Sequence, residues 1–124
     1  MAYKPKYFSE GEFRACTPAC TLADMDGAFM ARLDTLRELS GIPLVLTSAY
    51  RSREYEKAHG RSGTSAHCQG RAVDIRCHTS NNRYKIVRAA FALGFRRVGI
   101  GPSFIHIDEA ADHAQDVLWD YYGG

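Results

Sequence analysis

The sequence has no apolar run long enough to cross a bilayer, which excludes a membrane-spanning helix. Its formal net charge is only +2, too small to indicate a nucleic-acid partner by itself. Repeats, low-complexity tracts and linker-like segments are also absent, so nothing divides the 124 residues into separate domains. Hydrophobic residues make up 45% of the chain and charged residues 24%, which is typical of a globular domain with one core. We therefore expect a single domain, residues 1–124, with neither a membrane nor a nucleic acid as partner.

Cysteine is scarce too, at four residues, and the N-terminal segment lacks the continuous apolar stretch of a secretory signal. We therefore expect a chain that stays where it is made, with buried or free thiols instead of a disulfide framework. The spacing of the cysteines matches no common zinc-binding pattern; they are Cys16, Cys20, Cys68 and Cys77. A regulatory redox domain built on these thiols is an alternative interpretation, and it would require them to pair.

Hydrophobic periodicity predicts two main helices, because apolar residues recur at three- and four-residue steps. The first begins near Asp24, with Asp24 or Thr21 as its cap, and ends at Gly41. Its apolar stripe is Met25, Phe29, Leu33, Leu36 and Leu39. The second begins at Ser80 or Asn81. Its apolar stripe is Tyr84, Val87, Ala90 and Phe91.

Short runs of β-branched and aliphatic residues between turn formers predict strands at 44–48, 71–77, 98–100 and 104–108, the last two as a hairpin. A short helix with its charges outside is predicted for residues 53–59, and another for the tail, where Trp119 covers the core or flanks a cleft. Residues 1–20 are expected to form an irregular arm. These elements indicate an α+β fold, a small antiparallel sheet with helices packed on one side.

Residues capable of metal chemistry concentrate in two segments. His67 and Asp74 lie seven positions apart, and Gly70 between them permits a turn. Side chains alternate along a strand, so Asp74 and His106 each face away from their apolar neighbours. Two imidazoles and one carboxylate are the ligand set of a catalytic zinc, which keeps a fourth position for water. We predict one Zn²⁺ bound by His67, Asp74 and His106.

The segment SAHCQGRAVD resembles the SxHxxGxAxD motif of the M15 peptidases, zinc D,D-carboxypeptidases and endopeptidases of bacterial cell walls that share their fold with the hedgehog signalling domain. The matching residues are Ser65, His67, Gly70, Ala72 and Asp74. An upstream SAYRS and a downstream FIHID follow in the family's order, so the resemblance runs from about residue 24 to residue 108. It implies hydrolysis of a peptide bond in peptidoglycan stem peptides or crosslinks, with Arg51 and Ser65 in the substrate pocket.

The acid–base residue departs from the family pattern. One branch has an acidic residue three before the last histidine, where this chain has Ser103, and another has a histidine where this chain has Phe104. The best remaining carboxylate is Asp108, on the same face as His106 and roughly 6 to 7 Å along the strand. Glu109 is the alternative base. Asp108 can instead be a structural carboxylate that bonds a backbone amide or an arginine.

We therefore expect a monomeric zinc hydrolase of cell-wall peptides, with Arg51 as the clamp for a substrate carboxylate and Asp108 as the base. Without an export signal, such an enzyme reaches the wall after lysis, through a pore or as part of a virion, which favours a bacteriophage origin. Ser103 keeps open an alternative from another class. In that alternative the chain is a zinc-containing wall-binding or virion structural module without catalysis.

Overall fold

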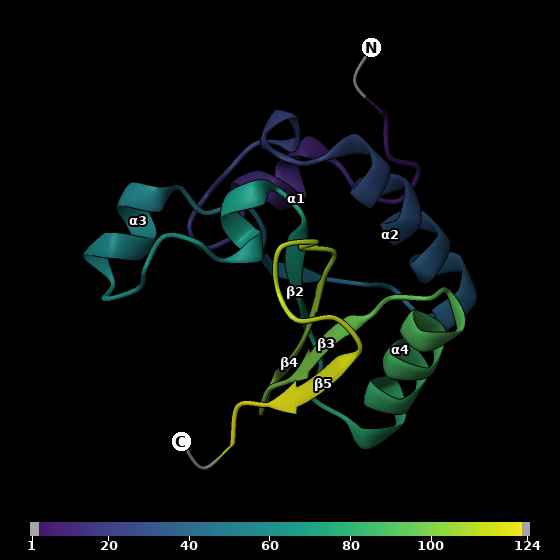
Figure 1. The fold of residues 1–124 in the computed structure, drawn as a ribbon. Coiled ribbons are helices and arrows are strands. Elements are labelled where there is room, and N and C mark those ends of the chain that lie inside the picture. Colours follow the sequence, from purple (N-terminus) through teal and green to yellow (C-terminus); the bar gives the residue numbers. More distant parts are fainter. Residues whose placement is uncertain (1–2, 123–124) are drawn as a thin grey trace.

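A five-stranded sheet forms the centre of the protein, which a computed structural model describes from residue 3 to residue 122 (Figure 1). Its strands, in spatial order, are β1 (Leu46–Ser48), β2 (Ala72–Arg76), β4 (Phe104–Asp108), β3 (Arg97–Ile100) and β5 (Val117–Asp120). The first four pair antiparallel, whereas β5 runs parallel to β3. The α+β class is confirmed, but the sheet is mixed and not purely antiparallel.

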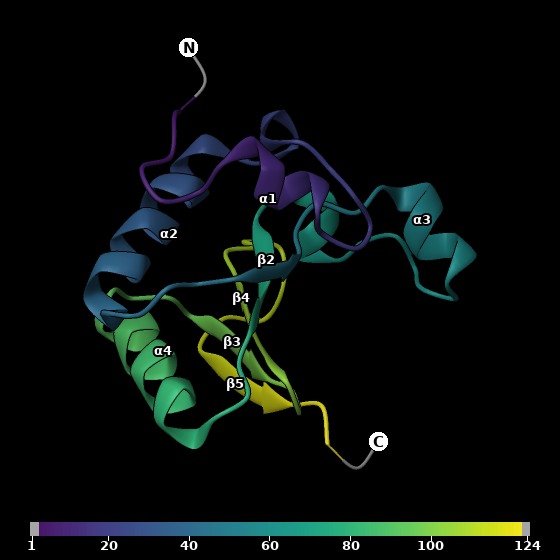
Figure 2. The same ribbon diagram turned by 180° about the vertical axis from the view of Figure 1, so that it is seen from behind.

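Within residues 3–122, four α-helices and two 3-10 turns flank the sheet. They are α1 (Glu10–Arg14), η1 (Leu22–Asp24), α2 (Gly27–Ser40), α3 (Arg53–Ala58), η2 (Ala66–Gln69) and α4 (Ser80–Ala92). Helices α2 and α4 pack together along one side of the sheet, while α3 lies on the opposite side of the molecule (Figures 1 and 2). Helix α1 falls inside the predicted irregular arm, which is therefore partly regular. No helix in residues 3–122 combines the length and the hydropathy that a membrane span requires.

The start of α2 differs from the prediction because another aspartate caps it. The Asp26 carboxylate accepts a hydrogen bond from the Phe29 N–H at 2.9 Å. Thr21 and Asp24, the predicted caps, instead close a capping box around η1. Gly41 ends α2 as predicted, with a left-handed φ of 73°.

The buried face of α2 matches the predicted stripe except at Leu39, whereas the buried face of α4 is rotated from its predicted stripe. The buried apolar residues are Phe29, Met30, Leu33 and Leu36 on α2, and Ile86, Ala89 and Ala90 on α4. Leu39, Tyr84 and Phe91 are exposed, contrary to prediction. A helix turns by about 100° per residue, which places these three away from the axis of the buried face. The apolar pattern alone was compatible with burial of either the predicted face or the observed face.

Leu33 offers a test of this packing. It is 0% exposed, so Leu33→Ala removes contacts from the core and leaves a cavity. We expect the free energy of unfolding to fall by about 2–5 kcal/mol. Leu39→Ala on the same helix is the control, since Leu39 is 50% exposed and we expect a change below about 1 kcal/mol. Urea denaturation of both variants measures the difference, and equal losses would contradict the assignment.

The tail after Asp108 forms a loop and strand β5, so the predicted tail helix is wrong. Val117 and Trp119 are half-buried, whereas Leu118 and Asp120 are exposed. This alternation is the period of a strand, and the register of β5 on β3 pairs Gly99 with Trp119.

One row of paired residues crosses four strands and leads to the functional site. Asp74 pairs with His106, His106 with Gly99, and Gly99 with Trp119. Paired residues share a face of the sheet, so this row lies opposite the core that Val73 and its neighbours form with the helices. A Cβ atom on Gly99 would lie 2.6 Å from the Trp119 indole nitrogen. Glycine at this position therefore lets the indole lie across β3, beside His106.

Candidate active site

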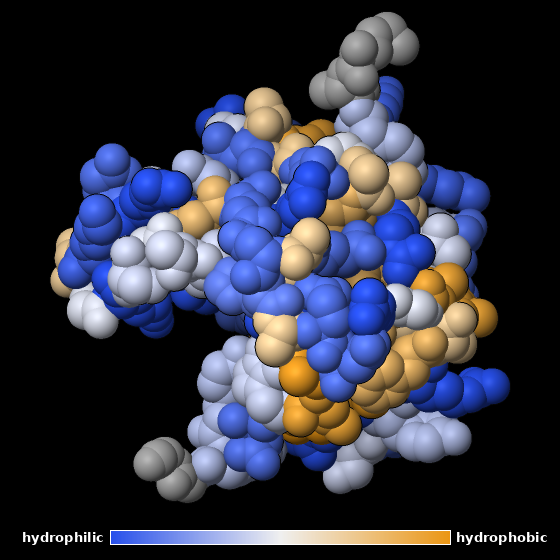
Figure 3. Space-filling view, viewed as in Figure 1, coloured by the Kyte–Doolittle hydropathy of each residue, from blue (hydrophilic) through white to orange (hydrophobic). Residues whose placement is uncertain are grey.

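A pocket of about 520 Å³ opens on the sheet face that carries this row. The surface is hollowed between the lobe that contains α3 and the C-terminal strand (Figure 3). The residues that line the pocket are Arg51, Glu56, Arg61, Ser65, Ala66, His67, Asp74, Arg97, Phe104, His106, Asp108, His113, Trp119 and Tyr121. This volume is in the range of about 300–1,000 Å³ that is usual for small-ligand sites.

His67 lies in the turn η2, and a backbone carbonyl fixes the orientation of its ring. Its Nδ1 atom is 2.6 Å from the Ala49 carbonyl oxygen. A carbonyl only accepts, so Nδ1 donates its proton there and Nε2 keeps a lone pair. Nε2 lies 3.5 Å from the Asp74 Oδ1 atom. Gly70, with a φ of 69°, ends the turn and directs the chain into β2, which carries Asp74.

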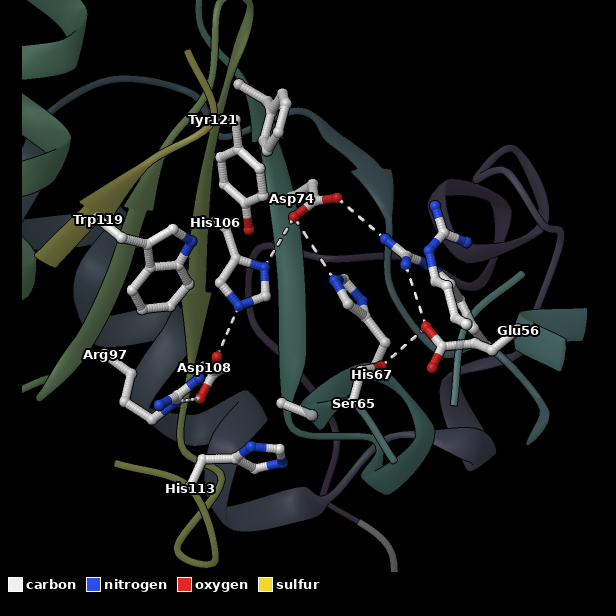
Figure 4. A pocket seen from close by; sticks show the side chains of 14 residues that line it. Glu56, Ser65, His67, Asp74, Arg97, His106, Asp108, His113, Trp119 and Tyr121 are labelled. Carbon is white, nitrogen blue, oxygen red and sulfur yellow. Dashed lines mark hydrogen bonds and ion pairs between the residues drawn. The ribbon is translucent and has the colours of Figure 1, made fainter. Parts of the chain in front are cut away.

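His106 is fixed in a similar way from the other side of the site. Its Nε2 atom is 2.6 Å from Asp108 Oδ2, and its Nδ1 atom is 3.0 Å from Asp74 Oδ1 (Figure 4). Asp108 thus engages the outer nitrogen, as Ala49 does for His67. The two inner nitrogens, Nε2 of His67 and Nδ1 of His106, both face the same carboxylate oxygen.

These three side chains fit a divalent cation. One ligand atom from each of His67, Asp74 and His106 can be chosen so that all three lie within 4.8 Å of one another. Nε2 of His67 and Nδ1 of His106 lie 3.5 Å and 3.0 Å from Asp74 Oδ1, short separations of the kind that zinc–ligand bonds of about 2.0–2.2 Å produce. Both histidines also have the outer hydrogen-bond partner that orients metal-binding imidazoles in proteins.

Electrostatics favour the ionised form of the carboxylate. Burial opposes the charge on Asp74, but the neighbouring imidazoles of His106 and His67 outweigh it and hold the pKa of Asp74 well below its usual range. Burial also opposes a positive charge on His106, but Asp108 and Asp74 outweigh it and raise the pKa of His106. The site therefore presents an anionic oxygen between two imidazoles.

Comparison with protein families matches residues 6–108 to the Peptidase M15 model. The chain belongs to the peptidase M15 family. Its members are metal-dependent peptidases, so this chain is a metallopeptidase with a candidate His–Asp–His metal site. A comparison with curated proteins gave no match.

Asp108, the predicted base of this M15 peptidase, is 1% exposed and has partners on both oxygens. Oδ1 accepts hydrogen bonds from Arg97 Nε at 2.6 Å and from the Ala110 N–H at 3.0 Å, while Oδ2 faces His106. This geometry favours the alternative interpretation, in which the carboxylate bonds an amide and an arginine. Glu109, the alternative base, pairs with Arg32 at 2.8 Å and is not among the residues that line the pocket, so its position does not favour that role.

Arg51 lines the M15 pocket, but protein groups already engage its guanidinium. Nε donates to Ser48 at 3.1 Å, one terminal nitrogen to Glu56 at 3.2 Å and the other to Asp74 Oδ2 at 3.3 Å. Ser65, predicted to bind substrate, donates its hydroxyl proton to Glu56 at 2.8 Å. The Arg51 guanidinium thus holds Asp74 through Oδ2, the oxygen that faces away from the imidazoles. Its further N–H groups can reach a substrate.

Three pocket residues, Glu56, Tyr121 and His113, were missed or misplaced from sequence, whereas Trp119 takes the cleft position that was one of its two predicted alternatives. Glu56, expected on an exposed helix face, is fully buried beneath Arg51. Trp119 and Tyr121 reach the pocket because the tail is a strand. His113 donates from Nε2 to the Thr64 carbonyl at 3.0 Å and so joins two loops at the rim. No local pattern separates Glu56 from other charged helix residues, whereas alternation in the tail indicates the strand.

All four cysteines are free, with Cys68 half-buried and the other three buried. Cys68 donates its thiol proton to Glu56 at 3.2 Å and so contributes to the same network. The paired thiols that a redox domain would require are not formed among the described residues.

Proposed function

We propose that this M15 peptidase is a zinc enzyme that cleaves a peptide bond in the stem peptides or crosslinks of peptidoglycan. The observation that carries the proposal is the convergence of His67, Asp74 and His106, with the outer nitrogen of each histidine already engaged. Two imidazoles and one carboxylate are a catalytic zinc set, since they leave a coordination position open.

The chain's own groups prepare the site for hydrolysis. A zinc ion held there would supply a Lewis acid that activates water and polarises the peptide carbonyl. Arg51 holds Asp74 through Oδ2, so that Oδ1 stays directed at the two imidazoles. Asp108 keeps a proton on Nε2 of His106, so that Nδ1 is the atom available as a ligand. Buried partners thereby fix both ligands before substrate arrives.

The pocket lining supports a peptide substrate with carboxylate groups. Arg51, Arg61 and His113 can supply donors to carboxylates, and Phe104 and Trp119 provide apolar surface for a peptide. Stem peptides of peptidoglycan carry both side-chain and terminal carboxylates. Arg51 has a dual assignment in this proposal, because it positions Asp74 and offers its remaining N–H groups to the substrate.

Purified cell wall incubated with the protein, with and without a chelator, tests the proposal. We expect released peptides that differ from the starting wall by cleavage at one bond, loss of release with chelator, and recovery on adding zinc. Mass analysis of the peptides identifies the bond. An unchanged wall in the presence of stoichiometrically bound zinc would contradict hydrolysis and favour the binding-module alternative.

Asp108→Asn separates a positioning role from a base role. We expect metal affinity to fall by about 10–100-fold, because Asn lacks the charge that orients His106. A competition titration with a zinc-sensitive dye measures this affinity. If Asp108 were only a base, kcat would fall while metal affinity stayed unchanged. Asp112→Asn is the control, since the Asp112 carboxylate is exposed in the following loop and binds Gln69.

A further inference from the structure

The hydroxyl group of Tyr121 enters the pocket from a part of the chain outside the family match. The match ends at residue 108, whereas Tyr121 directly follows β5. Figure 4 shows the phenol ring above His106, with its oxygen directed toward the space between His106 and Asp74. Two positions after Trp119, it shares the sheet face that carries the candidate metal ligands.

Contacts on several sides hold Tyr121 in this place. Its backbone N–H donates to the Ile100 carbonyl at 3.0 Å, which extends the pairing of β5 with β3. Its ring packs against Phe104 at a centroid distance of 5.0 Å and against Trp119 at 6.4 Å. A Cβ atom on Gly99 would lie 2.9 Å from the ring, so the side chain crosses β3 where the strand has no side chain. The hydroxyl therefore has a defined direction.

The hydrogen bonds around this hydroxyl leave its proton available. The indole nitrogen of Trp119 faces the phenol oxygen in Figure 4, and an indole N–H can only donate. Among the hydrogen bonds formed by residues 3–122, none uses the Tyr121 proton as donor. Tyrosine keeps this proton at neutral pH, since the usual pKa of a phenol is about 10. Tyr121 is thus a neutral donor directed at the candidate metal site.

We propose that Tyr121 is a catalytic residue whose hydroxyl donates a hydrogen bond to the scissile carbonyl oxygen as that oxygen gains negative charge. The inference rests on the proposed peptidase function. A preorganised donor at such an oxygen is among the largest contributions to catalysis. Arg51, another donor in the pocket, already donates to Asp74, Glu56 and Ser48, so only its remaining N–H groups are available to a substrate.

Tyr121→Phe tests the proposal because it removes only the hydroxyl. We expect kcat for wall-peptide cleavage to fall by about 10²-fold, the loss seen when one such donor is removed. KM and bound zinc should stay near the wild-type values, because the hydroxyl acts on the transition state. Tyr122→Phe is the matched control, since its hydroxyl donates to the Gly101 carbonyl and does not line the pocket. We expect that variant to retain wild-type kcat.

Binding supplies a second measurement that does not depend on turnover. The probe is a phosphinate analogue of the bond that the wild-type protein cleaves, because its tetrahedral anionic oxygens imitate the charged carbonyl. Calorimetry should show affinity for the phosphinate reduced about 10²-fold in Tyr121→Phe, with affinity for the cleaved peptide product unchanged. If Tyr121→Phe had the same kcat and the same phosphinate affinity as the wild-type protein, the Tyr121 inference would be overturned and the proposed peptidase function would stand. A wild-type protein that cleaves no wall peptide would overturn the proposed function and the Tyr121 assignment with it.

Discussion

His67→Ala is expected to remove the bound metal and to lower kcat/KM for wall-peptide cleavage by about 10³-fold or more. A catalytic metal supplies several kcal/mol of transition-state stabilisation, and about 4 kcal/mol corresponds to that factor. The substitution deletes one of three ligands and leaves Asp74 and His106 with a site that holds the ion weakly. Elemental analysis after gel filtration measures the metal, and peptide release measures activity.

Substitution of a histidine outside the pocket is the control for His67→Ala. His78 is exposed in the loop before α4 and does not line the pocket, so His78→Ala should keep both metal and activity. His67→Ala also deprives the Ala49 carbonyl of its donor, so circular dichroism must show that the variant is folded. Full metal content in a folded His67→Ala protein would contradict the assignment of His67 as a ligand.

Gly70→Ala is expected to lower the free energy of unfolding by about 3 kcal/mol, through backbone strain and overlap together. Gly70 has a φ of 69°, which an alanine adopts only at a cost. Its Cβ atom would also lie 2.4 Å from the Asp24 carbonyl oxygen, a backbone atom that cannot rotate away. Relieving this overlap displaces η2 relative to β2, so we also expect weaker metal binding. Thermal unfolding and metal titration measure the two effects.

Gly41→Ala is the control that isolates backbone strain. Gly41 has a φ of 73°, close to that of Gly70, but nothing lies within 4 Å of the position of its Cβ. We expect it to lose only about 1–2 kcal/mol and to bind metal normally. Equal losses in the two variants would mean that the close approach of Asp24 to Gly70 contributes nothing.

The candidate metal ligands were recognisable from sequence because local rules place them. Gly70 indicates the turn between His67 and Asp74, and the period of two residues assigns His106 to the polar side of its strand. The helix stripes were ambiguous, because Leu39 and Tyr84 continue an apolar pattern onto exposed surface. Only the position of the sheet decides which side of each helix is buried.

The other pocket groups depend on tertiary contacts that no local rule encodes. In the sequence, Glu56 looks like any solvated helix residue. Only the folded structure shows that Arg51 and Ser65 donate hydrogen bonds to its buried carboxylate. The tail contains alanine and glutamine, which favour a helix, and its alternating segment is short. Pairing with β3 overrides that preference and carries Tyr121 to the site. The role of Asp108 likewise depends on Arg97, eleven residues earlier on another strand.

The strands that carry the active-site residues differ in the number of hydrogen-bonded neighbours that support them. Strand β4, with His106 and Asp108, has hydrogen-bonded neighbours on both edges, and His106 pairs with Asp74 on one side and with Gly99 on the other. Strand β5, just before Tyr121, is bonded on one edge only. Outermost strands detach at a lower free-energy cost than central ones. The pairing that holds β4 is therefore expected to be more stable than the pairing that holds β5, so local opening of the sheet is expected to begin at the strand that precedes Tyr121.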